Sequence, residues 1–182
     1  MSKRVPSRSP SRPAPPIVDD TINQRGWSGL TFGDLHVKAA TLARCLLVLK
    51  KIRKLALKHK VDGVVCNGDF WDQRGMLFVR QIDAINEELQ RHKEAGISWI
   101  MIPGNHDQVT RDGQVHSLSI FDQYDNIHVV TDLELDDDRR IAYVPWREDA
   151  ELQAGLFKSV PAGYTAFGHG EIKGSVANNG HK

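Results

Sequence analysis

The sequence has little cysteine and no run of hydrophobic residues long enough to cross a membrane. Its two cysteines, Cys45 and Cys66, stand in apolar stretches, where small buried side chains are common. We predict that both are core thiols, and such a low cysteine content argues against a disulfide framework or a structural zinc site. The N-terminus also lacks the hydrophobic segment of a signal peptide. These absences predict a soluble cytoplasmic protein with no membrane partner.

The chain also lacks an excess of charge of one sign. It carries 24 Lys and Arg against 23 Asp and Glu, which gives a formal net charge of +1. No global field would concentrate a polyanion on such a surface, so any binding of nucleic acid must use a local patch of cations.

The first 25 residues differ from the rest in composition. Serine, proline and basic residues alternate there, and this composition cannot bury enough apolar surface to offset the entropy lost on ordering. We predict a disordered basic arm over residues 1–25, either as a solvated tail or as a contact to nucleic acid. Residues 26–182 form the predicted folded domain.

From Trp27 onward, short apolar strands alternate with amphipathic helices. Strands that alternate with helices normally lie parallel in one sheet. The predicted elements of this first part are a strand over 29–32, a helix over 38–60, a strand over 61–66, a helix over 77–94 that ends before Gly96, and a strand over 98–102.

After His116 the pattern changes to strands separated by short polar turns. Strands over 127–130, 133–135 and 141–144 suggest a meander, and hence a second sheet packed on the first. A helix over 148–160 and a strand over 164–167 follow. The predicted fold class is therefore α/β, with two packed mixed β-sheets flanked by helices.

Four of the predicted strands end in glycine followed by residues that commonly bind metals. In an open α/β sheet the carboxyl ends of neighbouring strands meet at one crevice, so clusters far apart in the sequence can form one site. The clusters are Gly33-Asp34-Leu35-His36, Gly68-Asp69-Phe70-Trp71-Asp72, Gly104-Asn105-His106-Asp107 and Gly168-His169-Gly170-Glu171.

The residue types in these clusters indicate a particular chemistry. Asp and His together suit a divalent cation such as Mn²⁺, Fe²⁺ or Zn²⁺. Asp69 belongs to the central cluster and is placed to bridge two ions. Two bridged ions can bind a phosphate oxygen, lower the pKa of water and stabilise an in-line displacement.

Alone, each motif has a simpler explanation. Asp34 at a strand end could cap the next helix, and Gly-Asn-His-Asp could be a turn. It is their order, with each at a strand end, that favours a shared site. Histidines outside the clusters are predicted to be surface or core residues, namely His59, His92, His116 and His128. The tryptophans are predicted to be packing residues, namely Trp71, Trp99 and Trp146.

The motifs together resemble the calcineurin-like metallophosphoesterase signature of Gly-Asp-x-His, Gly-Asp-x-x-Asp and Gly-Asn-His-Asp with a later His. The resemblance implies that Asp34 and His36 bind one metal, that Asp69 bridges, and that Asn105 and His169 bind the second. It further implies that His106 is the catalytic histidine, which contacts the transition state and can protonate the leaving oxygen. Asp72 and Asp107 would orient the ligands.

A finer resemblance concerns the substrate. The segment over residues 167–174, with Asn178-Asn179-Gly180 after it, resembles SbcD-type DNA repair exonuclease subunits, particularly phage-encoded ones. This implies a Mn²⁺-dependent DNA nuclease subunit that works with a coiled-coil ABC-type ATPase, and it allows a homodimer. The alternatives are a stand-alone phosphatase or phosphodiesterase for a small phosphoester, and an inactive copy of the scaffold that binds DNA or protein.

One motif of the family pattern has no counterpart in this chain. The pattern has a further Gly-His-x-His after the histidine that matches His169, whereas here the sequence reads Gly180-His181-Lys182. We expect that the chain is truncated, that the final motif strand is missing, and that the 182-residue chain binds Mn²⁺ weakly and has little or no nuclease activity. The alternative is that His181 stands in for one of the missing ligands.

Overall fold

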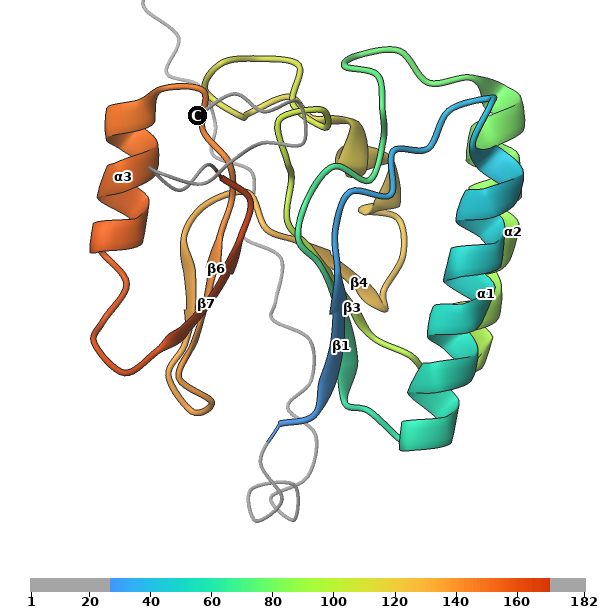
Figure 1. The fold of residues 1–182 in the computed structure, drawn as a ribbon, viewed down its shortest axis with the longest axis horizontal. Coiled ribbons are helices and arrows are strands. Elements are labelled where there is room, and N and C mark those ends of the chain that lie inside the picture. The colour runs from blue at the N-terminus through green and yellow to red at the C-terminus, as the bar shows by residue number, and fades with distance from the viewer. Residues whose placement is uncertain (1–26, 171–182) are drawn as a thin grey trace, which may run out of the picture.

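Two β-sheets lie face to face between helices in the computed structural model, which describes residues 27–170 (Figure 1). The predicted arm over residues 1–25 and Glu171 of the last cluster lie outside this range. The first sheet is parallel throughout, and its order is β1 (Gly29–Phe32), β2 (Gly63–Cys66), β3 (Trp99–Met101), β4 (Ile127–Val129). The second sheet has the order β5 (Glu134–Asp136), β6 (Ile141–Val144), β7 (Thr165–Gly168), with β5 antiparallel and β7 parallel to β6.

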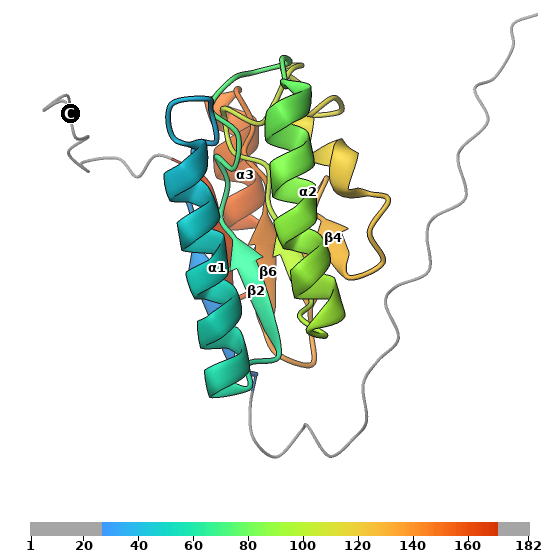
Figure 2. The ribbon, with the colours of Figure 1, turned by 90° about the vertical axis from the view of Figure 1, so that its right-hand side faces the viewer.

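The helices cover the outer faces of the two sheets. Helices α1 (Leu42–His59) and α2 (Val79–Glu94) lie side by side against the first sheet, as Figure 2 shows. Helix α3 (Ala150–Lys158) lies outside the second sheet (Figure 1). These four layers confirm the predicted fold class of two packed sheets flanked by helices. Within the described part of the chain, no helix is both long and apolar enough to span a membrane.

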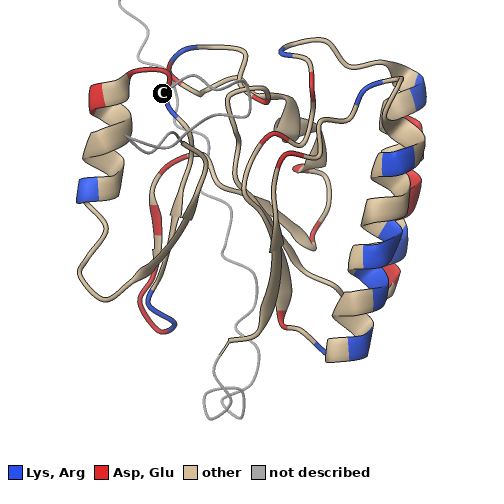
Figure 3. Ribbon diagram, in the orientation of Figure 1, with Lys and Arg blue, Asp and Glu red and all other residues tan. Residues whose placement is uncertain are grey.

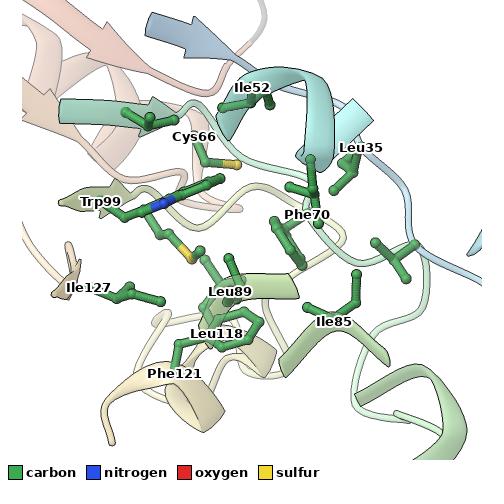
Figure 4. Close-up of a cluster of buried hydrophobic side chains, with 14 of the residues drawn as sticks. Leu35, Ile52, Cys66, Phe70, Ile85, Leu89, Trp99, Leu118, Phe121 and Ile127 are labelled. Atoms are coloured by element: carbon green, nitrogen blue, oxygen red, sulfur yellow. The ribbon is translucent and has the colours of Figure 1, made fainter. Parts of the chain in front are cut away.

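The alternation of side chains along β2 divides the core into two parts. Val64 and Cys66 point toward the helices and join the larger cluster, drawn in Figure 4, while Val65 points toward the second sheet. Between the sheets Val65 meets Ile141 and Tyr143. All three β2 side chains are completely buried. The prediction that Cys66 and Cys45 are core thiols is confirmed, since both are buried and free.

The predicted meander is wrong, because β4 belongs to the first sheet. It pairs in parallel with β3, with Trp99 opposite Ile127, and Ile127 and Val129 pack into the core under the helices. The turn that follows carries the chain across to the second sheet. Alternation gave the strand correctly but not its partner, since an apolar-polar-apolar pattern does not show in which sheet a strand lies.

The predicted start of the first helix is also wrong, by four residues. Residues 38–41 form a turn instead, in which the Lys38 N–H donates to Thr41 Oγ1 at 3.1 Å and the Thr41 hydroxyl donates to the His36 carbonyl at 2.8 Å. A short polar side chain that bonds to the local backbone competes with helix formation in this way. The turn fixes the segment that follows His36.

The bounds of two strands, the end of α2 and the burial of the tryptophans and histidines can be compared with the predictions. The strands over 29–32 and 141–144 coincide with β1 and β6, and α2 is followed by Gly96 with φ of 70°, as a helix stop requires. Trp71 and Trp99 are buried, as packing residues should be, and Trp146 is half-buried. Of the histidines outside the clusters, His92 and His116 are buried, and His59 and His128 are exposed.

Candidate metal centre

All the residues predicted for the site lie at the carboxyl ends of strands from both sheets. Asp34 and His36 follow β1, and His169 follows β7, at the end of the second sheet. The other predicted residues are Asp69 and Asp72 after β2, and Asn105, His106 and Asp107 after β3. The fold therefore brings together clusters that the sequence separates by whole strand-helix steps.

Three of these residues have an unusual backbone conformation. The φ angles are 55° at Asp34, 48° at His36 and 54° at Asp69, in the left-handed region that side chains other than glycine seldom adopt. Each such residue costs on the order of 1 kcal/mol or more, and such residues cluster at functional sites. Backbone bonds hold the loops in place, because the Asp34 N–H donates to Gly68 O at 3.1 Å and the His36 N–H donates to Asp69 O at 3.0 Å.

Two glycines are required by close approach to the ligand side chains. A Cβ on Gly104 would lie 2.2 Å from Asp69 Oδ1 and 2.4 Å from the Asp69 backbone nitrogen. A Cβ on Gly68, where φ is 97°, would lie 2.6 Å from His169 Nδ1. The glycines before the clusters therefore let the side chains of neighbouring loops meet.

Asp69 lies at the centre of the site, and its side chain is only 5% exposed. Its Oδ2 atom lies 3.7 Å from His36 Nε2 and 3.5 Å from His169 Nε2. Its Oδ1 atom accepts the His106 backbone N–H at 2.9 Å. His36 Nε2 also lies 3.7 Å from Asp34 Oδ1, and the Asp34 side chain is 71% exposed, so the site is open to solvent on this side.

His169 meets acceptor atoms on both sides of its ring. Its Nδ1 atom lies 2.9 Å from the Asn67 carbonyl oxygen, which can only accept, so Nδ1 carries the proton. Its Nε2 atom lies 2.9 Å from Asn105 Oδ1 and 3.5 Å from Asp69 Oδ2. With Nδ1–H fixed by Asn67, Nε2 is the atom that could bind a cation together with these two oxygens.

His106 is held in a similar way by the second cluster. Its Nδ1 atom donates to the Asp72 backbone carbonyl at 2.7 Å, which leaves the Nε2 lone pair available. The His106 and His36 rings meet edge to face, with centroids 4.9 Å apart. Lys38 donates to Asp72 Oδ1 at 2.8 Å, and this bond lowers the pKa of the Asp72 carboxyl below its usual value. Asp72 Oδ1 also lies 3.7 Å from His36 Nδ1.

The buried Asp107 side chain joins the loops that follow β2 and β3. Its buried carboxylate accepts backbone N–H groups from Trp71 at 2.9 Å, Gly104 at 3.0 Å and Phe70 at 3.2 Å. Burial raises the pKa of this carboxyl to about 6, although the N–H donors act in the opposite direction. Asp107 thus fixes the backbone that carries Asp69 and Asn105.

The residues of the site fit divalent cations. The ligand atoms of His36, Asp69 and His106 lie within 4.8 Å of one another, and so do those of Asp34, Asp69 and His169. Asp69 belongs to both groups, as a bridging carboxylate would. These groups divide the residues differently from the family resemblance, which pairs Asp34 with His36, so the division of ligands between two ions stays a prediction. His36 Nε2 is the ring nitrogen that faces Asp34 and Asp69, while His36 Nδ1 is buried and makes no hydrogen bond with the described residues.

Two contributions to the site were not predicted from the sequence. Lys38 neutralises part of the charge of Asp72, and its place two residues after His36 in an apparent helix gave no signal. The Asn67 carbonyl fixes the tautomer of His169, and a backbone atom leaves no trace in residue type. Only the folded loops show either contact.

Parts of this chain are similar to known proteins. The chain is 37% identical over 73 residues to the DNA double-strand break repair protein Mre11 of Sulfurisphaera tokodaii, which covers 40% of this chain and 19% of that protein. The chain thus matches about a fifth of that relative's length. A crystal structure of the Pseudomonas putida nuclease MPE is 20% identical, covers 64% of this chain and 52% of its own, and superposes with a TM-score of 0.45.

The family comparison spans most of the domain. The model of the calcineurin-like phosphoesterase family matches residues 30–178, a range that holds every residue of the site described above. The chain therefore belongs to the calcineurin-like phosphoesterase family.

Proposed function

We propose that this protein hydrolyses phosphodiester bonds in DNA, using two divalent cations. The observation that carries the proposal is the central position of Asp69, whose Oδ2 atom lies 3.7 Å from His36 Nε2 and 3.5 Å from His169 Nε2. A carboxylate between two sets of ligands is the arrangement that a pair of ions needs. DNA is favoured as substrate because the curated relative bears the name of a DNA double-strand break repair protein.

The donor set supports Mn²⁺ as the first choice, with Fe²⁺ or Zn²⁺ as alternatives. In our proposal Asp34, His36 and Asp69 hold one ion, and Asp69, Asn105 and His169 hold the other. Bound there, the cations would polarise the phosphate ester and lower the pKa of water. Asp107 and Asp72 would keep the ligands in position through the bonds described above.

We assign His106 to the leaving oxygen of the substrate. Its Nδ1–H is fixed by the Asp72 carbonyl at 2.7 Å, so the ring cannot turn freely and only Nε2 is available to hold or give a proton. The ring is partly exposed and lies beside that of His36. A general acid at this place would protonate the leaving oxygen as the ester bond breaks.

The first experiment compares substrates with the whole protein. Linear duplex DNA and p-nitrophenyl phosphate are each incubated with Mn²⁺ and with EDTA, and the His106→Ala variant is run beside His59→Ala, an exposed histidine far from the site. We expect Mn²⁺-dependent cleavage of DNA that is lost in His106→Ala and kept in His59→Ala. Rapid cleavage of p-nitrophenyl phosphate with intact DNA would instead establish the small-ester phosphatase. No cleavage of either substrate, with DNA binding retained, would establish the inactive scaffold.

The partners and location are further proposals. We propose a coiled-coil ABC-type ATPase as the working partner, a homodimer as the assembly and the cytoplasm as the compartment. Co-purification from the source cell, followed by measurement of the mass of the complex, tests the partner and the homodimer, since an ATPase should be recovered in stoichiometric amount with two copies of this protein. Cell fractionation tests the compartment, and recovery in a fraction other than the cytoplasm would contradict that proposal. Recovery of the protein alone, as a monomer, would contradict the first two.

A further inference from the structure

Helix α1 lies in a stretch that is basic throughout. Residues 38–60 contain eight Lys or Arg and no Asp or Glu, although the whole chain has a formal net charge of only +1. A third of the 24 basic residues therefore lie in one short segment. Figure 3 shows this as a run of blue along α1, which no other helix repeats among the residues described.

The inner and outer faces of α1 differ in the burial and the charge of their side chains. The inner face buries Cys45, Leu49 and Ile52 against the sheet, and Arg53, which faces α2, is neutralised by buried Glu88 at 3.0 Å. The outer face carries five exposed cations that make no ion pair with any carboxylate of residues 27–170. We call these residues the basic face of α1: Arg44, Lys50, Lys51, Lys54 and Lys58.

The stability of the helix does not explain the basic face. Lys50, Lys54 and Lys58 follow one another at intervals of four residues, and like charges at this spacing repel and destabilise a helix. Helix α2, by contrast, carries both acidic and basic residues on its exposed face, and Arg91 Nη2 lies 3.7 Å from Glu87 Oε2. A helix can therefore have a charged surface without a run of like charges. No carboxylate of residues 27–170 offsets the repulsion among the cations on the basic face of α1. An anionic partner bound there would offset it.

We propose that the basic face of α1 binds the phosphate backbone of duplex DNA and extends the substrate-binding surface away from the metal centre. The inference rests on the proposed function and supplies the local patch of cations that a nearly neutral nuclease needs. From Arg44 to Lys58 the helix rises about 21 Å, which matches about six base pairs of duplex. The N-terminal end of α1 lies beside the site, because Lys38, four residues before the helix, contacts Asp72.

An anionic membrane is the competing occupant. Leu47 and Leu57 are 66% and 51% exposed on the same side of the helix, and basic helices with exposed leucines also bind lipid surfaces. Such helices need a broad apolar face to insert, however, and the apolar face of α1 is already buried against the first sheet. DNA is therefore the favoured occupant, because the N-terminal end of α1 also lies beside the candidate metal centre.

The test removes three charges from the basic face and compares a control that loses the same charge elsewhere. The test variant carries Lys51→Gln, Lys54→Gln and Lys58→Gln, and the control carries three exposed substitutions away from α1, Arg80→Gln, Arg140→Gln and Lys158→Gln. Both keep residues 1–26, so any contribution of that segment is equal. Affinity for a fluorescent duplex of about 20 base pairs is measured in EDTA, so that cleavage is absent, over a series of salt concentrations.

We expect the test variant to bind at least about tenfold more weakly at low salt, and its plot of log K against log salt to lose about 2–3 units of slope. The control should stay within one unit of wild type. Equal slopes in both variants, or no duplex binding by wild type, would overturn the inference. So would loss of binding to vesicles that contain phosphatidylserine when duplex affinity is unchanged. Binding through α1 by a protein that cleaves no DNA would support this inference and contradict the proposed function.

Discussion

Acidification should destabilise the fold through one buried histidine, His92. The ring is completely buried between α1, α2 and β3. Its Nε2–H donates to the Leu49 carbonyl at 3.1 Å, and its Nδ1 accepts the Trp99 indole N–H at 3.3 Å. The neutral ring thus satisfies both neighbours, whereas a protonated ring would face the indole N–H with a second proton.

The magnitude follows from the pKa of this histidine. Burial lowers the pKa from 6.5 to about 4 and outweighs the hydrogen bond to Leu49 and the charge of Glu88, whose Oε1 atom lies 3.8 Å from Nε2. Arg53 lowers the pKa further. Between these two values the unfolded chain binds a proton that the folded chain does not. The contribution of His92 is therefore complete above about pH 6.5, is lost as the pH falls toward 4 and changes no further below. At about 1.4 kcal/mol per unit, the loss is about 3 kcal/mol.

Urea unfolding at a series of pH values from about 8 to about 4 measures this contribution. In His92→Gln the amide can donate to Leu49 and accept from Trp99, so the hydrogen bonds remain and the titration is gone. We expect the variant to lose about 3 kcal/mol less stability than wild type over this range. His59→Gln, at an exposed position, serves as control and should follow wild type. Identical pH profiles for wild type and His92→Gln would refute the reasoning.

Three further predictions concern the site and its loops. His106→Ala should keep metal binding in calorimetry while turnover falls roughly 10²- to 10³-fold, and equal loss of both would contradict its assignment to the leaving oxygen. Asp69→Ala should lose both ions, so retention of two equivalents of Mn²⁺ would disprove the bridge. Gly104→Ala should weaken Mn²⁺ binding, because its Cβ would lie 2.2 Å from Asp69 Oδ1, whereas Gly155→Ala in α3, with nothing within 4 Å, should leave binding unchanged and stabilise the helix by about 0.5–1 kcal/mol. Unchanged Mn²⁺ affinity in Gly104→Ala would show that the loop adjusts freely.

Much of the site could be predicted because its signals are local. A glycine at a strand end followed by Asp34 or Asp69 is visible within four residues of sequence, and the strand-helix rhythm places such clusters at one edge of a sheet. The same rhythm predicted β1 and β6 with their observed bounds. What the residue types could not predict is which of these side chains lie close enough to share one cation, since the distances among them depend on the folded loops.

The errors arose where distant partners decide the structure. Alternation identified β4 but could not show that it pairs with β3, because the alternation of Ile127 and Val129 with a polar residue does not specify the partner strand. The turn before α1 was missed because Lys38 reads as an ordinary helical residue, while its contacts to Thr41 and Asp72 depend on three dimensions. Propensity is a weak guide where a single polar side chain can replace a helical turn.

The bond between His169 and the Asn67 carbonyl has a consequence for the order of folding. It joins atoms 102 residues apart, whereas the loops of the first sheet meet after much shorter separations. Closing so long a loop is slow, and early contacts form between segments that are near in sequence. The first sheet can therefore gather Asp34, Asp69 and Asn105 while the chain is still partly folded, but the imidazole opposite them arrives only when β7 pairs with β6. In our proposal only the ion held by Asp69, Asn105 and His169 requires the second sheet, so binding of this second ion would distinguish fully folded molecules from partly folded ones.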